Sequence, residues 1–104
     1  MNDRGLYQSV LIEFRDTYGN VADRLQALIA AAKWREAEVL AHTLKGTSGM
    51  LSADALYSAT TALDNSLKVA RDGSDPPATM GAELVRLRQE LVRLLVGINR
   101  LAEN

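Results

Sequence analysis

The segment "WREAEVLAHTLKGTSGML", residues 34–51, decides the fold class because its core-type side chains recur at helical spacing. On an α-helix these side chains form one narrow stripe. The stripe comprises Ala37, Leu40, Ala41, Leu44, Ser48 and Leu51. It continues across Gly46 and Gly49, although glycine costs roughly 1 kcal/mol against alanine inside a helix. The segment therefore predicts one uninterrupted helix.

The rest of the chain predicts four further helices, and signals for strands are weak. Their apolar residues recur at helical spacing over residues 6–18, 21–32, 56–70 and 84–101. Asn20 and Ser52 are the expected N-caps of the second and fourth helices, and a short turn near Lys33 precedes the third. The stretch 71–81 holds both prolines and is the expected loop.

In the last helix, leucines and one isoleucine alternate in steps of three and four, a pattern typical of helices that pack at a shallow angle. We therefore expect an all-α fold: an antiparallel up-and-down four-helix bundle, with the first helix as an additional N-terminal cap or lid. Residues 1–104 are expected to form a single domain, because the length suits one core and no linker or repeat is present.

Composition excludes several classes of function. The net charge of −1 comes without clustered Lys and Arg, which argues against nucleic-acid or polybasic membrane binding. The chain lacks cysteine and has one histidine, so disulfides, thiolate chemistry and a His-rich metal site are ruled out. No apolar run approaches the length of a membrane span, and the first residues lack a signal-peptide core. We expect a soluble, cytoplasmic domain.

Helix geometry predicts where the histidine, His42, points. It falls roughly 150° from the centre of the apolar stripe, so we expect it to face solvent or a partner protein. Gly46 and Gly49 would leave a bare strip beside the imidazole where another macromolecule can approach. Val39 and Met50 lie on the same side, either as apolar docking contacts or as scattered surface residues or contacts to the first helix.

The chemistry of an exposed imidazole suits phosphoryl transfer. A neutral ring nitrogen is available as a nucleophile near neutral pH. Lys45, at i+3, supplies a cation that can meet a phosphoryl group on that nitrogen; without His42 it would be an ordinary surface lysine. The sequence contains neither a Gly-rich nucleotide loop nor a second base for a triad.

Acidic residues along the helices are interpreted as solvated faces. They include Glu36, Glu38, Asp54 and Asp64. Glu38, four residues before His42, is the exception, because it is on the histidine side and can orient a ring nitrogen or contact a partner. The alternative for Glu38 is a plain surface carboxylate.

The stretch "AHTLKGTSGMLSADAL", residues 41–56, closely resembles the signature of histidine-containing phosphotransfer (HPt) domains, His-x-Leu-Lys-Gly followed by small residues. Residues 11–46 resemble the family's two helices leading into the active helix. The resemblance covers most of the chain, and its specific part is residues 41–53. It implies an up-and-down four-helix bundle, in agreement with the periodicity.

The resemblance also implies roles for single residues. His42 would be phosphorylated, Lys45 would contact the phosphoryl group, and Gly46 would leave room for the partner. Gly49 matches a position that is usually small. Ser52 is a departure, because family members often carry glycine there; a slightly different helix turn and no loss of chemistry are expected.

By this resemblance the chain is a phosphocarrier in a multistep His–Asp phosphorelay. Its partner would be a response-regulator receiver domain, which supplies the acidic pocket, the phosphorylatable aspartate and Mg²⁺. The chain would need no cofactor or metal of its own, would not bind ATP, and would act as a monomer. It would be a free-standing shuttle or the C-terminal module of a hybrid sensor histidine kinase.

Two other functions remain open. One is the phosphoacceptor module of a chemotaxis-type histidine kinase, which receives phosphate from ATP bound to its own kinase domain. The other is a non-catalytic helical adaptor that docks a partner through the glycine strip. The adaptor predicts that His42→Gln leaves function intact.

Overall fold

The computed structural model describes residues 3–103, and all regular elements among them are α-helices. The helices are α1 (Asp3–Tyr18), α2 (Val21–Ala30), α3 (Trp34–Met50), α4 (Asp54–Arg71) and α5 (Met80–Glu103). The expected all-α fold is thus confirmed for these residues. The helix across Gly46 and Gly49 is also confirmed, because α3 continues through both. None of the described helices has the length and apolarity that crossing a membrane requires.

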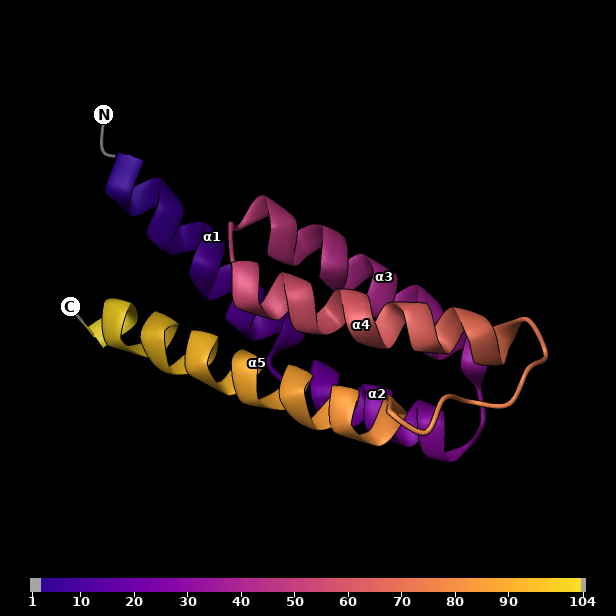
Figure 1. The fold of residues 1–104 in the computed structure, drawn as a ribbon. Helices are drawn as coiled ribbons and strands as arrows, with labels where there is room; N and C mark the ends of the chain where they lie inside the picture. Colours follow the sequence, from indigo (N-terminus) through magenta and orange to yellow (C-terminus); the bar gives the residue numbers. More distant parts are fainter. Residues whose placement is uncertain (1–2, 104) are drawn as a thin grey trace.

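The helices form an elongated bundle with extents of 51 × 20 × 19 Å. In Figure 1, α3, α4 and α5 run lengthwise beside one another, and α1 and α2 follow each other along one side. The main contacts join α3 to α4, α4 to α5, and α2 to both α3 and α5. Helix α1 packs along α5 and buries Leu11 and Phe14. The expected cap or lid is therefore wrong, because α1 lies lengthwise against the bundle.

The core is built from the apolar stripes of the helices. Burial of each large aliphatic side chain contributes about 1.5–3 kcal/mol. The fully buried leucines that join the helices are Leu25, Leu44, Leu56, Leu63, Leu67 and Leu87. The stripe predicted on α3 faces this core, with Ala37, Ala41 and Ser48 buried and Leu40 partly so. The opposite face of α3 is thereby left outside the bundle.

Glycine ends α1. A Cβ at Gly19 would lie 2.7 Å from the carbonyl oxygen of Arg15, which no real side chain tolerates. Asn20 follows at the N-cap position of α2 as predicted, although its side chain makes no capping hydrogen bond. The helix therefore ends between α1 and α2 because the backbone at Gly19 lies too close to the Arg15 carbonyl for a residue with a Cβ.

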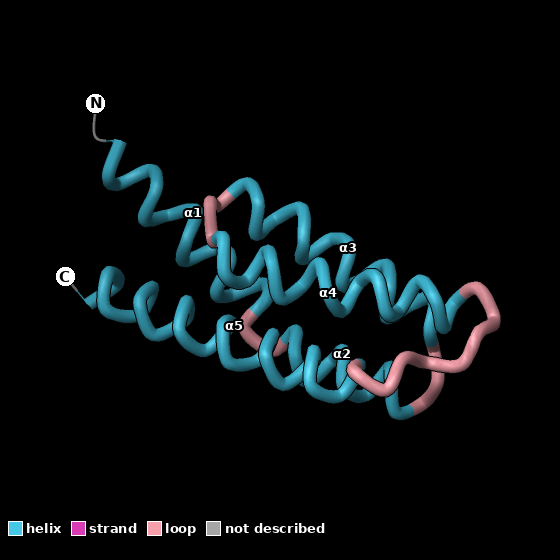
Figure 2. Tube along the Cα trace, viewed as in Figure 1, coloured by secondary structure: helices cyan, strands magenta, loops and turns pink. Residues whose placement is uncertain are grey.

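The turn between α3 and α4 differs from the prediction. Ser52 has a positive φ of 56°, and Ala53 occupies the N-cap position of α4. The backbone N–H of Ala53 donates to the carbonyl of Ser48 at 2.9 Å, which closes α3 with a left-handed residue after its C-cap. The prediction of Ser52 as N-cap is thus wrong, because this residue ends α3. The remaining connections include the long loop between α4 and α5 (Figure 2).

Candidate functional site

His42 lies on the outer face of α3, and its side chain is 65% exposed. Its neighbours Ala41 and Leu44 are fully buried on the opposite side of the helix. The outward orientation predicted from helical spacing is therefore observed. A solvent-accessible imidazole on a rigid helix is a suitable nucleophile for a group that a partner delivers.

A carboxylate lies behind the imidazole. Asp64, on α4, is fully buried, and its Oδ2 lies 3.6 Å from Nδ1 of His42 and 3.3 Å from Nζ of Lys68. Neither oxygen of the Asp64 side chain accepts a hydrogen bond in this arrangement. Burying a carboxylate without hydrogen bonds is costly, so nearby positive charge or a donated proton stabilises it strongly.

Glu38 is the second buried carboxylate of the site. It lies one helical turn before His42, and its Oε1 accepts a 2.8 Å hydrogen bond from Nη1 of Arg71 on α4. The pKa of Glu38 is raised above 4.5, first by hydrogen bonding of the protonated carboxyl to Asp64, then by burial and the charge of Asp64; Arg71 opposes the rise. Glu38 and Asp64 thus interact as two buried carboxyl groups, and this interaction favours the protonated form of Glu38.

The interpretation of the acidic residues as solvated faces is wrong for Asp64. For Glu38, which the sequence analysis set apart, the alternative of a plain surface carboxylate is wrong as well. Glu36 and Asp54 are exposed, whereas Glu38 and Asp64 are buried. Asp64 follows the core residue Leu63, at the edge of the α4 stripe. That position was the signal in the sequence, because a polar residue at a stripe edge is buried when the facing helix packs closely.

Lys45 contacts an aromatic ring. Its Nζ lies 5.9 Å from the ring centroid of Tyr57 on α4, a cation–π distance. A Cβ on Gly49 would lie 3.4 Å from the same ring, whereas one on Gly46 would meet nothing within 4 Å. Gly46 therefore leaves open space, as expected. Gly49 is exposed as well, and it borders the ring of Tyr57 on one side.

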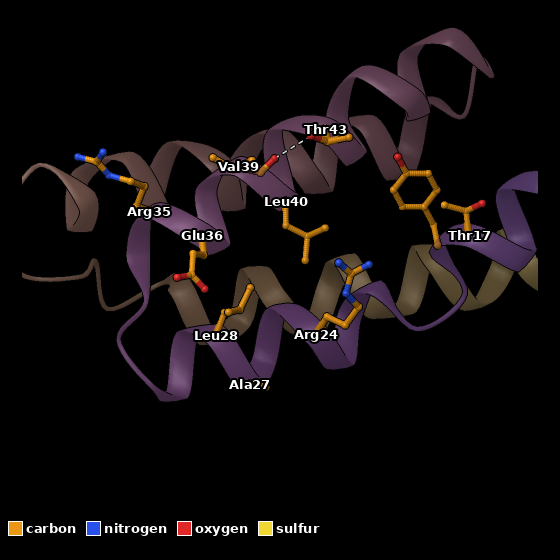
Figure 3. A pocket seen from close by; sticks show the side chains of 10 residues that line it. Thr17, Arg24, Ala27, Leu28, Arg35, Glu36, Val39, Leu40 and Thr43 are labelled. Atoms are coloured by element: carbon orange, nitrogen blue, oxygen red, sulfur yellow. Dashed lines mark hydrogen bonds between the residues drawn. The ribbon is translucent and has the colours of Figure 1, made fainter.

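Two apolar grooves lie on the outer side of α3. The larger, of about 850 Å³, runs between α2 and α3, where Leu28 and Leu40 point into the space (Figure 3). Val39 lines it, and Thr43 donates a 2.9 Å hydrogen bond to the Val39 carbonyl. Met50 lines the second groove, of about 360 Å³, with residues of α1. Val39 and Met50 are thus exposed apolar groups at the margins of grooves, 58% and 88% accessible.

Comparison with known protein families decides the class of this arrangement. A family model described as "Hpt domain" matches residues 9–97, which include α2, α3 and α4 entirely. The chain belongs to the Hpt domain family. HPt domains transfer phosphoryl groups in His–Asp phosphorelays and interact with receiver domains, so the family agrees with an exposed imidazole on a helix. Neither the curated proteins nor the solved structures yield a significant match.

Proposed function

We propose that this HPt domain is a phosphocarrier that accepts and donates a phosphoryl group on His42, in exchange with the aspartate of a response-regulator receiver domain. The observation that carries the proposal is the buried Asp64 carboxylate 3.6 Å behind an exposed imidazole. This arrangement orients the ring and leaves its outer nitrogen to the partner.

The two ring nitrogens have different tasks in this mechanism. With the proton on Nδ1, facing Asp64, the lone pair of Nε2 is free to react. The 3.6 Å separation is longer than a hydrogen bond, and a small rotation of the exposed ring closes it. Asp64 thereby fixes the reactive tautomer.

In the transfer step, Nε2 attacks the phosphorus of the receiver's aspartyl phosphate. The N–P bond forms as the P–O bond breaks, and the electron pair leaves with the receiver's carboxylate. The proton stays on Nδ1, so the phosphorylated ring is cationic and Asp64 compensates its charge. Donation to a receiver is the reverse reaction.

Lys45 supplies positive charge from the solvent side. Its contact with Tyr57 is partly exposed and contributes about 0.5–1 kcal/mol. A phosphoryl group on His42, one turn away, attracts the ammonium more strongly than the ring does. We therefore assign Lys45 to the phosphoryl group after transfer and to Tyr57 before it.

The docking surface follows from the outer face of α3. Gly46 lets a receiver approach closely, and Val39 and Met50 offer apolar contact beside it. Gly49 contributes space for Tyr57. Glu38 was expected among the docking residues, but it is only 7% exposed; we assign it to the support of Asp64 instead.

The receiver provides Mg²⁺, and the carrier requires no metal or cofactor for transfer. We further propose that the domain works in the cytoplasm as a monomer, free-standing or within a hybrid histidine kinase.

Transfer from a phosphorylated receiver to the wild-type chain and to His42→Gln tests the function. Label on the wild type alone supports the carrier. Label that comes only from a kinase domain with ATP, never from a receiver, favours the chemotaxis-type module. Undiminished function of His42→Gln in its pathway favours the adaptor.

A further inference from the structure

We propose that Glu38, His42 and Asp64 form a site for a divalent transition-metal ion, and that the bound ion blocks phosphoryl acceptance by His42. The block rests on the proposed function, whereas metal binding does not.

The ligand atoms are close enough to share one ion. Each of the three side chains offers one such atom, and all lie within 4.8 Å of one another. Metal–ligand bonds of about 2.1 Å bridge two atoms that are 3.6 Å apart, the separation of Nδ1 and Oδ2. Glu38 needs only a small side-chain movement. Since Glu38 and His42 lie one turn apart on α3 and Asp64 comes from α4, two packed helices hold the ligands.

A second observation points to a ligand. Asp64 is fully buried, its carboxylate faces the imidazole, and neither of its oxygens accepts a hydrogen bond. A buried carboxylate with unused lone pairs gains more from a cation than a hydrated one does, because water does not compete.

The two neighbouring cations are compatible with an ion. Lys68 lies 3.3 Å from Asp64, but its side chain is 38% exposed, so its ammonium can move into water. Arg71 bonds Oε1 of Glu38 and leaves Oε2 as a metal ligand. It then acts as the outer hydrogen-bond partner that orients a ligating carboxylate.

The donor set defines the class of metal. One imidazole and two carboxylates suit Zn²⁺ and similar first-row ions, whereas Mg²⁺ and Ca²⁺ prefer oxygen ligands alone. With three protein ligands, a fourth position stays open to water. We therefore choose Zn²⁺ as the probe.

Metal binding and phosphoryl acceptance need opposite tautomers of His42. A metal takes the lone pair of Nδ1, so the proton of the neutral ring resides on Nε2. Nε2 then has no lone pair with which to attack phosphorus. Asp64 thus has two effects. In the metal-free chain it favours the reactive tautomer of His42, and in the metal-bound chain it helps to bind the ion that excludes this tautomer.

Zn²⁺ titration of the tag-free chain, followed by calorimetry and by ¹⁵N NMR of the ring, tests the site. His42 is the only histidine in the chain, so its ring signals are unambiguous. We expect one Zn²⁺ per chain on Nδ1, with affinity reduced at least tenfold in Asp64→Asn and in Glu38→Gln, and abolished in His42→Gln. The control Glu36→Gln changes an exposed carboxylate on the same helix and should bind as the wild type does.

Equal affinity of the wild type and Asp64→Asn, or coordination through Nε2, would overturn the site. Circular dichroism checks that each variant folds. If Asp64→Asn does not fold, the comparison of wild type with Glu38→Gln and with the surface variant His42→Gln decides in its place.

The block is tested in transfer from a phosphorylated receiver at constant Mg²⁺. Saturating Zn²⁺ should slow acceptance at least tenfold, and a zinc-selective chelator should restore it. Any effect of zinc on the receiver is measured as the rate at which the phosphorylated receiver alone loses its label with and without Zn²⁺. An unchanged rate with Zn²⁺ bound contradicts the block, whereas absence of transfer without zinc contradicts the proposed function and leaves the titration to decide the metal site.

Discussion

The buried carboxylate of Asp64 lies 3.6 Å from Nδ1 of the exposed imidazole of His42, across the contact between α4 and α3. One residue of this pair is fully inaccessible, and the other is 65% accessible. The pair therefore joins the core of the bundle to the surface where a partner arrives.

Asp64→Asn should slow phosphoryl acceptance by roughly tenfold or more, because the amide neither fixes the tautomer nor compensates the charge of the ring. The free energy of unfolding should stay constant or rise slightly, because Lys68 can turn to solvent and no buried charge is left unpaired. Transfer kinetics and urea denaturation measure both effects. Asp54→Asn, an exposed change on the same helix, is the control, and an unaltered transfer rate in Asp64→Asn would contradict the mechanism.

Glu38 should make stability depend on pH. Its pKa is raised in the folded chain above 4.5, so folding takes up a proton in the window from 4.5 to the folded value. This contribution is largest below the window and is lost as pH rises through the folded pKa. Compared with Glu38→Gln, the wild type should therefore lose stability as the pH rises across the window, as urea denaturation at several pH values would measure. The exposed Glu36→Gln should follow the wild type; parallel curves for wild type and Glu38→Gln would contradict the raised pKa.

Gly46→Leu should fold and still fail to dock. A side chain there meets open space, and leucine favours a helix by about 0.5–1 kcal/mol over glycine. The variant should be more stable than the wild type but should accept phosphate from receivers at least tenfold more slowly. Gly97→Leu on α5 also meets open space, so it controls for propensity alone. Wild-type transfer by a folded Gly46→Leu would exclude close approach at this position.

Ser52→Gly should stabilise the chain. Ser52 holds a left-handed φ of 56°, which costs a residue with a Cβ about 1 kcal/mol. Glycine removes this strain, so the midpoint of denaturation should rise while transfer kinetics stay unchanged. A lower midpoint would show that the hydroxyl contributes more than the strain costs.

The outward direction of His42 was predictable from the sequence because it depends only on the period of one helix. The same holds for the course of α3 and for the break before Asn20. The burial of Glu38 and Asp64 was not predictable in this way. Both are at the edges of apolar stripes, and whether an edge is buried depends on how closely α3 and α4 pack.

Two further features needed the three-dimensional structure. Serine is a residue type that favours N-cap positions. At Ser52, however, the backbone hydrogen bonds that close α3 determine the conformation. Gly49 is on the outer face by helical spacing, yet the ring of Tyr57 reaches it from α4. Helical spacing alone therefore predicts neither the backbone closure at Ser52 nor the contact of Tyr57 with Gly49.

The measurement that tests the central claim most directly is transfer of label from a phosphorylated receiver, with Mg²⁺, to the wild-type chain and to His42→Gln. The proposal predicts acid-labile label on the wild type, returned to a second receiver, and none on a folded His42→Gln. Label on His42→Gln, or failure of the wild type to accept phosphate from any cognate receiver, would contradict it.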